Sequence, residues 1–302
     1  MRLIKKWTLA TFILTFLVII AGGVVRTTQS GMGCPDWPKC FGMWIPPTNE
    51  SQLPLDFEKY LKEQDIDRTF NALHTWTEYI NRLFGVLLGV FAIIQFWLIQ
   101  KRKKDLVIAF KLAISFLIVV IITGLVGAIV VKLNLHKLSI SLHLVLAIVL
   151  VQIQLALLMS VSNNLFKKTS GIKARRLLFV LLVLILIQTL FGTGVRMYVD
   201  DISKALNYQQ RYAWFSPKDL PSIFLIHRTF SWIVLLSVLY IYWQCKKVAV
   251  LKKHLLRTII IILTNITTGI VLYYLDMPKV VQPIHLLLAT ISITQVAFLI
   301  LH

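Results

Sequence analysis

The sequence predicts an all-α integral membrane protein, with eight transmembrane helices arranged as two tandem four-helix bundles that an internal repeat relates. Composition is the first reason: 57% of the 302 residues are hydrophobic and the mean hydropathy is +0.76, whereas soluble domains are roughly 45–50% apolar. The second is length, because the apolar residues gather in blocks of about 20, which span a bilayer core as a helix. The third is that short motifs of the first half recur, in the same order, in the second.

Eight apolar blocks mark the expected spans. They fall at about residues 8–25, 70–99, 107–131, 139–160, 177–197, 221–244, 255–275 and 281–301. For the first block a secretory signal peptide is the alternative, because Lys5 and Lys6 precede an apolar run that ends in small residues. The repeat favours retention as a helix, since the fifth block copies the first.

The charges are distributed as in a membrane protein rather than in a nucleic-acid-binding protein. The net charge is +19, but the basic residues cluster in connections between alternate blocks, at 2–6, 101–104, 167–176 and 246–257. This is the positive-inside pattern. We therefore expect a multi-pass protein of the cell (inner) membrane, with lipid around it, both termini cytoplasmic and no nucleic-acid partner. Loops 26–69, 132–138, 198–220 and 276–280 then face outward.

The two halves of the chain match at four places. The matching residues are 23–26 with 192–196, 80–84 with 226–230, 123–126 with 268–271, and 142–147 with 284–289. A repeat of four spans returns the chain to its starting side, so the copies share one orientation about an axis along the membrane normal. Each copy can close as a four-helix bundle. We expect an N-terminal bundle at 1–160, a cytoplasmic linker at 161–176 and a C-terminal bundle at 177–302.

Two of the outward loops have features of their own. In loop 26–69, residues 56–64 are expected to form a short interfacial helix. Its apolar side chains toward the lipid would be Phe57, Tyr60 and Leu61. Loop 198–220 carries aromatic side chains that suit the headgroup level. They are Tyr198, Tyr208, Tyr212, Trp214 and Phe215.

In the second half, two histidines are expected at the same depth. His227 opens the sixth span and His285 the eighth, and both spans run inward from the outer face. Two imidazoles at one depth in a four-helix bundle can ligate a haem iron from both sides, and the apolar bundle keeps them neutral and dry. Two hydrogen-bonded structural histidines, or a proton relay, are the alternatives.

The first half differs at one of these positions. It keeps His143 on its fourth span, but Asn81 stands where the second half has His227. An amide is a poor iron ligand, so the first site is not a copy of the second. His74 is the remaining histidine on that helix face, about 10 Å outward of Asn81 at a rise of about 1.5 Å per residue. Either a shifted helix brings His74 to an iron opposite His143, or His143 is the only strong ligand.

Glu78 takes the place that Phe224 has in the second half, and it shares a helix face with His74 and Asn81. An acid near the end of a membrane helix is by default a functional residue. One interpretation is an acid–base group beside a reactive centre. The other is a structural ion pair with Arg82, one turn along the helix.

Arginines recur at the same places in both halves. Arg82 and Arg228 follow the candidate ligand positions, and Arg26 and Arg196 end the first and fifth spans. Haem propionates are anions that guanidinium groups bind bidentately. Arginines that snorkel to the interface, or an ion pair in the case of Arg82, are the alternatives.

Cys34 and Cys40 flank a short segment of the first outer loop that contains two prolines. Thiols outside the cytoplasm are oxidised, so a disulfide is expected. A metal site is disfavoured, since neither a histidine nor a further cysteine lies nearby in the sequence. A plain structural staple and a reversible redox pair are both open.

Taken together, these residues resemble the haem A synthase family of cytochrome-oxidase assembly enzymes. The resemblance covers nearly the whole chain. It rests on residues 22–34, the Cys34/Cys40 loop, residues 78–82 and three histidine positions. These histidines are His143, His227 and His285.

The resemblance implies a reaction and two haems. The C8 methyl group of haem O, bound as substrate in the N-terminal bundle, is converted to a formyl group by successive hydroxylations. A haem b in the C-terminal bundle is the electron carrier. His227 and His285 match the axial ligands of haem b, His143 matches a ligand of the substrate haem, and Glu78 matches the glutamate required for catalysis. Implied partners are haem O synthase and the assembly of cytochrome oxidase.

The chain departs from the family pattern in two places. The Glu-x-x-His of the second span is here Glu78-x-x-Asn81, so His74 is expected to supply the missing ligand. Cys34 and Cys40 match the family's outer-loop pair, but the second half lacks the pair that some bacillary members carry there. A disulfide is therefore not general to both bundles.

Two other functions compete with this one. A di-haem electron-transfer protein that oxidises quinol would use two equivalent haems, which the asymmetry at Asn81 argues against. A transporter built from repeats would use spans that Gly or Pro interrupts near mid-membrane, and such spans are lacking here.

Overall fold

The computed structural model describes residues 1–62, 70–162, 171–206 and 220–301. Within these ranges every regular element is a helix, and eight helices are long and apolar enough to cross a membrane. The predicted all-α membrane fold class is therefore confirmed. The tandem repeat stays a prediction.

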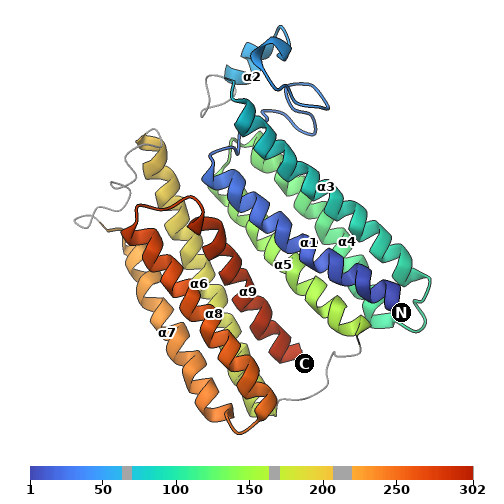
Figure 1. The fold of residues 1–302 in the computed structure, drawn as a ribbon, viewed down its shortest axis with the longest axis vertical. Coiled ribbons are helices and arrows are strands. Elements are labelled where there is room, and N and C mark those ends of the chain that lie inside the picture. The colour runs from blue at the N-terminus through green and yellow to red at the C-terminus, as the bar shows by residue number, and fades with distance from the viewer. Residues whose placement is uncertain (63–69, 163–170, 207–219, 302) are drawn as a thin grey trace. The chain divides into compact units, whose positions relative to one another are not determined.

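The chain divides into two compact units, Met1–Asn163 and Asn164–His302 (Figure 1). The long helices of the first unit are α1 (Arg2–Thr27), α3 (Ala72–Gln100), α4 (Val107–Lys132) and α5 (Lys137–Val161). Contacts join α1 to α3, α3 to α4, α4 to α5 and α5 to α1, so the four helices form a closed ring.

The second unit has the same order of contacts. Its helices are α6 (Ile172–Ala205), α7 (Ser222–Cys245), α8 (Ala249–Tyr274) and α9 (Val281–Leu301). Here α6 contacts α7, α7 contacts α8, α8 contacts α9 and α9 contacts α6. In each ring, the second and fourth helices in chain order therefore stand diagonally, and side chains pointing inward from them can meet at the centre.

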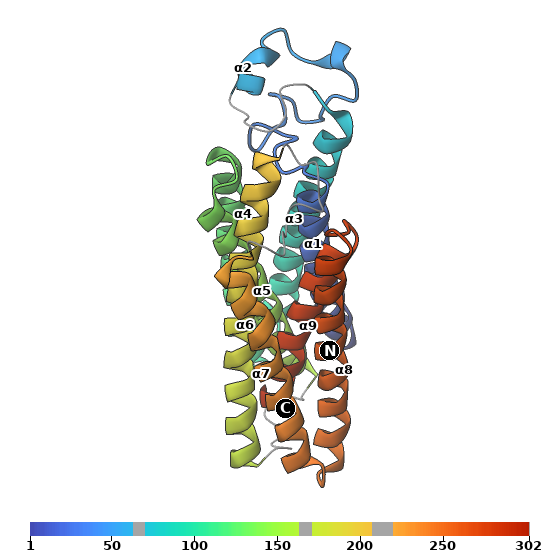
Figure 2. The same ribbon diagram turned by 90° about the vertical axis from the view of Figure 1, so that its left-hand side faces the viewer.

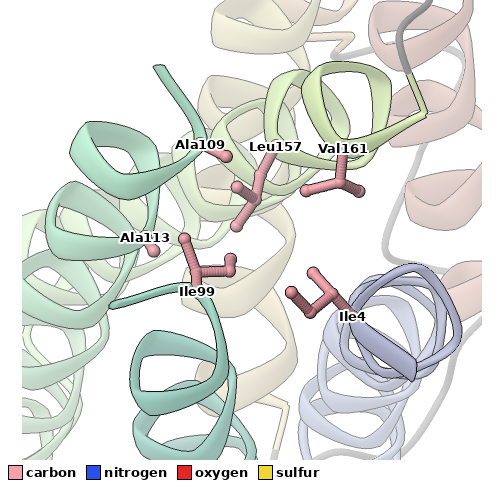
Figure 3. Packing of buried hydrophobic residues seen from close by; sticks show 6 residues of the cluster. All are labelled: Ile4, Ile99, Ala109, Ala113, Leu157 and Val161. Atoms are coloured by element: carbon pink, nitrogen blue, oxygen red, sulfur yellow. The ribbon is translucent and has the colours of Figure 1, made fainter. Parts of the chain in front are cut away.

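The interior of the first unit is packed with aliphatic side chains. At the end where α1 begins and α3 ends, six buried residues from all four helices converge (Figure 3). They are Ile4, Ile99, Ala109, Ala113, Leu157 and Val161. The small side chains on α4 let the helices approach closely, while Leu157 and Ile99 fill the centre.

The outer faces of the helices are apolar as well. On α1, Leu9, Ile13 and Leu17 are spaced at i, i+4 and i+8 and are exposed. On α7, Trp232 and Leu236 continue the same pattern. Such stripes face lipid in a membrane protein, where the backbone bonds of a helix are satisfied internally.

The first outer loop folds onto the beginning of α3. It contains the short helices η1 (Glu50–Gln52) and α2 (Phe57–Lys62), and Figure 2 shows α2 beyond the end of the helices of its unit. The expected helix at 56–64 is thus present. Tyr60, however, packs edge-on against Phe41, with ring centroids 6.0 Å apart, in a cluster around Cys34 and Cys40. The expectation that Tyr60 faces lipid was wrong, because the loop has a small core of its own.

One span is longer than predicted. The fifth span was expected at 177–197, with a loop from 198, but α6 continues to Ala205. Val199 packs against Met277 there, and Ile202 joins the same cluster, so the apolar stripe extends beyond the length a bilayer requires. Four aromatic residues of the expected loop, Tyr208, Tyr212, Trp214 and Phe215, lie outside the described residues.

Candidate functional site

The two histidines of the second unit lie close together, on helices that stand diagonally in the ring. His227 lies on α7 and His285 on α9. Their ring centroids are 6.4 Å apart and their planes are inclined by 73°. Two metal–nitrogen bonds of about 2 Å, plus roughly 1 Å from each nitrogen to its ring centre, give a separation of about 6 Å. The pair is therefore spaced as two imidazoles would be on opposite sides of one iron.

The hydrogen bonds around His285 fix which of its nitrogens is free to bind a metal. The hydroxyl of Thr268 donates its single hydrogen to the carbonyl of Asn265, at 2.7 Å. It must therefore accept the hydrogen bond that it forms with Nδ1 of His285, at 2.8 Å. Nδ1 then carries the ring proton, and Nε2 keeps its lone pair. A ligand histidine is commonly oriented in this way.

These observations fit a haem better than a bare metal ion. Within the described ranges, no three His, Cys, Asp or Glu side chains are grouped so that they could hold a metal. A porphyrin supplies four of the six iron ligands itself, so two imidazoles suffice. In addition, Nδ1 of His227 is buried without a hydrogen-bond partner.

In the first unit, Glu78 is buried near the beginning of α3, with only 4% of its surface exposed. One carboxylate oxygen, Oε2, accepts the backbone N–H of Cys34 at 2.9 Å. The other, Oε1, accepts from Nη2 of Arg82 at 2.6 Å and from Nε at 3.2 Å. The ion pair weighed from the sequence is thus present. Glu78 thus joins α3 to the loop that contains Cys34 and Cys40.

Arg82 fastens the same loop from the other direction. Its Nη1 donates to the carbonyls of Asp36, at 2.6 Å, and Lys39, at 2.9 Å. Its Nη2 donates to the carbonyl of Cys34, at 2.9 Å. With the two bonds to Glu78, all five guanidinium N–H groups have an acceptor. A propionate contact would have to displace one of these bonds.

The disulfide expected between Cys34 and Cys40 is formed, and both residues are fully buried. Below it, the loop lies directly on α3. A methyl group added at Gly33 would lie 2.4 Å from the backbone of His74, so only glycine fits at this contact. The hydroxyl of Thr75 also donates to the carbonyl of Gly33, at 2.8 Å. His74 is thereby held in the first turn of α3, half-buried under the loop.

The other two candidate positions of the first unit lie on diagonal helices. His143 is on α5, with its ring against Gly127 of α4 and with Nδ1 buried and unpartnered. Asn81 is on α3, with Oδ1 4.0 Å from where a methyl group at Gly22 of α1 would lie. A contact that would join His143 to His74 was a sequence expectation, and it stays a prediction.

Arg228, the counterpart of Arg82, has a different environment. It is exposed, and its guanidinium lies 5.8 Å from the ring centroid of Phe224. Phe224 stands where the first unit has Glu78, so the second unit has no carboxylate at this position. A propionate contact for Arg228 stays a prediction.

Several residues that shape the site were missed in the sequence. In the sequence, Thr268-Gly269 was matched to Thr123-Gly124. In the structure, Gly269 lies against the ring of His285, but the glycine against the ring of His143 is Gly127 rather than Gly124. The matched and the observed glycine are one turn apart and share a helix face. The repeated glycines were a visible signal, but their contact with a histidine depends on how the helices pack.

Comparisons with known proteins agree with this picture. The model of the family described as cytochrome oxidase assembly protein matches residues 5–297. A protein of Bartonella quintana named Heme A synthase is 30% identical over 115 residues, which are 35% of this chain and 32% of that protein. One of Sphingopyxis alaskensis with the same name is 31% identical over 108 residues, 33% of this chain and 30% of the relative.

A third Heme A synthase, of Paramagnetospirillum magneticum, is 30% identical over 125 residues, 39% of this chain and 35% of the relative. The chain thus spans about a third of the length of the curated relatives it matches. The family model, in contrast, extends over both units. The chain belongs to the cytochrome oxidase assembly protein family.

Proposed function

We propose that the protein is a haem A synthase, which oxidises the C8 methyl group of haem O to a formyl group by successive hydroxylations. The family match and the names of the relatives support this activity. The observation that carries it is the pair of imidazoles in the second unit, whose centroids are separated by 6.4 Å. That pair supports a haem protein, and the missing imidazole at Asn81 supports different roles for the two units.

In this proposal, His227 and His285 hold a haem b in the C-terminal unit. The haem supplies one-electron transfer, for which a closed coordination sphere with two imidazoles is suited. The chain's own part is to fix the rings and to keep water away. The hydrogen bond from Nδ1 of His285 to Thr268 keeps Nε2 available to the iron.

The N-terminal unit takes haem O as its substrate, with His143 as the strong ligand. His74 or Asn81, both on α3, would supply the second contact to the iron. An amide there would leave that side of the substrate haem weakly ligated, which suits chemistry better than electron transfer.

Glu78 is the proposed acid–base group of the reaction. Conversion of a methyl group to a formyl group adds oxygen and takes electrons and protons from the carbon. Haem b would carry the electrons away, so the site also needs a group that accepts the protons. Oε1 of Glu78 accepts two N–H groups of Arg82, whereas Oε2 accepts the N–H of Cys34 and keeps a second lone pair for a proton. Those bonds hold the carboxylate in one orientation.

The proposal also includes the surroundings. We place the protein in the cell (inner) membrane with both termini cytoplasmic, so that the disulfide loop lies outside. The partners would be haem O synthase, which supplies the substrate, and the assembly of cytochrome oxidase, which consumes the product.

The test is to purify the full chain from a host that makes haem O but no haem A of its own. A pyridine haemochrome spectrum, with extraction and mass measurement of the bound haems, should show haem b together with haem O or haem A. Two equal bis-imidazole haems without formyl product would identify a di-haem electron-transfer protein instead. A preparation that folds normally without haem would refute both.

A variant set tests the role of Glu78. Glu78→Ala should keep bound haem O and lose formyl formation, whereas Arg82→Ala, which breaks the same ion pair, should keep part of the activity. Equal losses in both variants, together with equal loosening of the disulfide loop, would show that Glu78 serves the loop alone. Full activity of Glu78→Ala would refute a catalytic role.

A further inference from the structure

Three candidate histidine ligands, His143, His227 and His285, each lie against a glycine of a neighbouring helix. A methyl group added at Gly192 of α6 would lie 3.1 Å from Cε1 of His227. At Gly127 of α4 the distance to Cε1 of His143 would be 3.2 Å, and at Gly269 of α8 the distance to Cε1 of His285 would be 3.4 Å. Ordinary carbon contacts begin at about 3.5 Å, so the first two rings occupy space that a side chain would need.

Each of these rings also lies within electrostatic range of a backbone carbonyl one turn before the glycine. The ring of His143 interacts with the carbonyl of Thr123, that of His227 with Gln188, and that of His285 with Asn265. The Nδ1 atoms of His143 and His227 are buried and have no hydrogen-bond partner.

The recurrence of this contact has a physical reason. In a helix, the carbonyl at i−4 accepts the N–H of residue i and keeps a second lone pair. A side chain at residue i would cover that lone pair, whereas a glycine exposes it to a ring from the neighbouring helix. The three glycines lie four residues after Thr123, Gln188 and Asn265, as this explanation requires.

We propose that Gly127, Gly192 and Gly269 are positioning residues, which set the distance and rotation of the haem-ligating imidazoles against the carbonyl one turn earlier. This inference rests on the proposed function, because it assigns the imidazoles to haem. It goes beyond that function by naming residues on three further helices that determine how well the ligands meet the iron. Orientation of a ligand by its surroundings typically changes metal affinity about 10- to 100-fold.

The chain offers a matched control for each unit. Gly194 lies two residues from Gly192 on the same helix, but a methyl group there would lie 2.7 Å from Cγ1 of Ile223, an apolar side chain. Gly124 lies one turn from Gly127, and a methyl group there would meet nothing within 4 Å. Gly194 thus serves as a control for helix packing, and Gly124 as a control without any contact. Both can be compared with the glycines proposed to hold a ring.

The experiment uses the full chain carrying its haems, with haem b content, the low-spin electron paramagnetic resonance signal and thermal unfolding measured in parallel. Gly192→Ala should lower haem b retention about 10-fold or more and shift the low-spin signal of what remains. Gly269→Ala should act in the same direction and less, since its contact is longer. Gly194→Ala should lower the unfolding midpoint by about 2–10 °C and leave the signal unshifted.

In the first unit, Gly127→Ala should lower haem O retention and leave haem b unchanged, while Gly124→Ala should change neither. A wild-type signal and full haem b content in Gly192→Ala would overturn the inference, as would equal spectral shifts in Gly192→Ala and Gly194→Ala. Wild-type protein that holds a bis-imidazole haem b but forms no formyl product would refute the proposed function alone. Wild-type protein without such a haem would refute both.

Discussion

Replacing Arg82 by glutamine should release the disulfide loop from α3 while the helices stay folded. The change removes both bonds to the buried carboxylate of Glu78 and up to three bonds to the loop carbonyls. Removing one partner of a buried ion pair costs about 3–5 kcal/mol, and each hydrogen bond to a carbonyl adds about 0.5–1.5 kcal/mol. The side chain of Arg82 is 13% exposed, so solvent screens part of this sum.

We take about 4 kcal/mol as the resulting loss in the free energy of loop opening, which corresponds to a roughly 1000-fold larger opening equilibrium. Hydrogen exchange measures this directly at Cys34, because its backbone N–H is bonded to Glu78 of α3 only while the loop is closed. This amide should exchange up to 1000-fold faster, as local opening predicts. The amides of Phe41 and Gly42, which bond to Asp36 within the loop, should change less. Amides in the middle of α3 should be unaffected.

A second readout is the rate at which a water-soluble phosphine reduces the buried disulfide between Cys34 and Cys40. It should rise in parallel with the exchange. Arg228→Gln is the matched control. Arg228 is exposed, and its guanidinium lies against the ring of Phe224. Unchanged exchange and reduction in Arg82→Gln, or equal changes in Arg228→Gln, would refute the reasoning.

Three further predictions concern the two units separately. Asn81→His should give the first unit a second imidazole, so that the substrate haem becomes low-spin and formyl formation falls. Optical spectra and product analysis check this, and unchanged spectra would contradict it. Thr268→Val removes the acceptor of the His285 Nδ1–H and should lower haem b affinity about 10-fold or more. Thr267→Val is the control and should not lower it, because the exposed hydroxyl of Thr267 bonds to the carbonyl of Leu263 on its own helix. Leu157→Ala should cost about 2–5 kcal/mol of stability in denaturant unfolding, while the exposed Leu142→Ala should cost little; equal effects would refute the packing shown in Figure 3.

The number and the approximate places of the eight spans could be predicted from the sequence, because a span is a local property. About 20 consecutive apolar residues must cross a bilayer as a helix, whatever surrounds them. The end of α6 could not be predicted in this way. Its last turns are held by the contact of Val199 with Met277, a residue 78 positions later in the printed sequence.

The imidazole pair was also predictable in part. The equal depth of His227 and His285 follows from their distance to the span ends, and equal depth is necessary for a shared iron. That the two ring centroids come within 6.4 Å of each other depends on helix rotation, which side-chain packing sets.

What the sequence by itself determined is therefore the set of spans, the depth of the histidines, the loss of one imidazole at Asn81 and the pairing of two loop cysteines. All of these depend on composition or on spacing along one element. Tertiary structure alone decided that Arg82 uses every N–H group on Glu78 and the loop, and that a glycine lies against the imidazoles of His143, His227 and His285. Such contacts join residues of different helices, and their geometry follows from how the helices pack rather than from the pattern along any one of them.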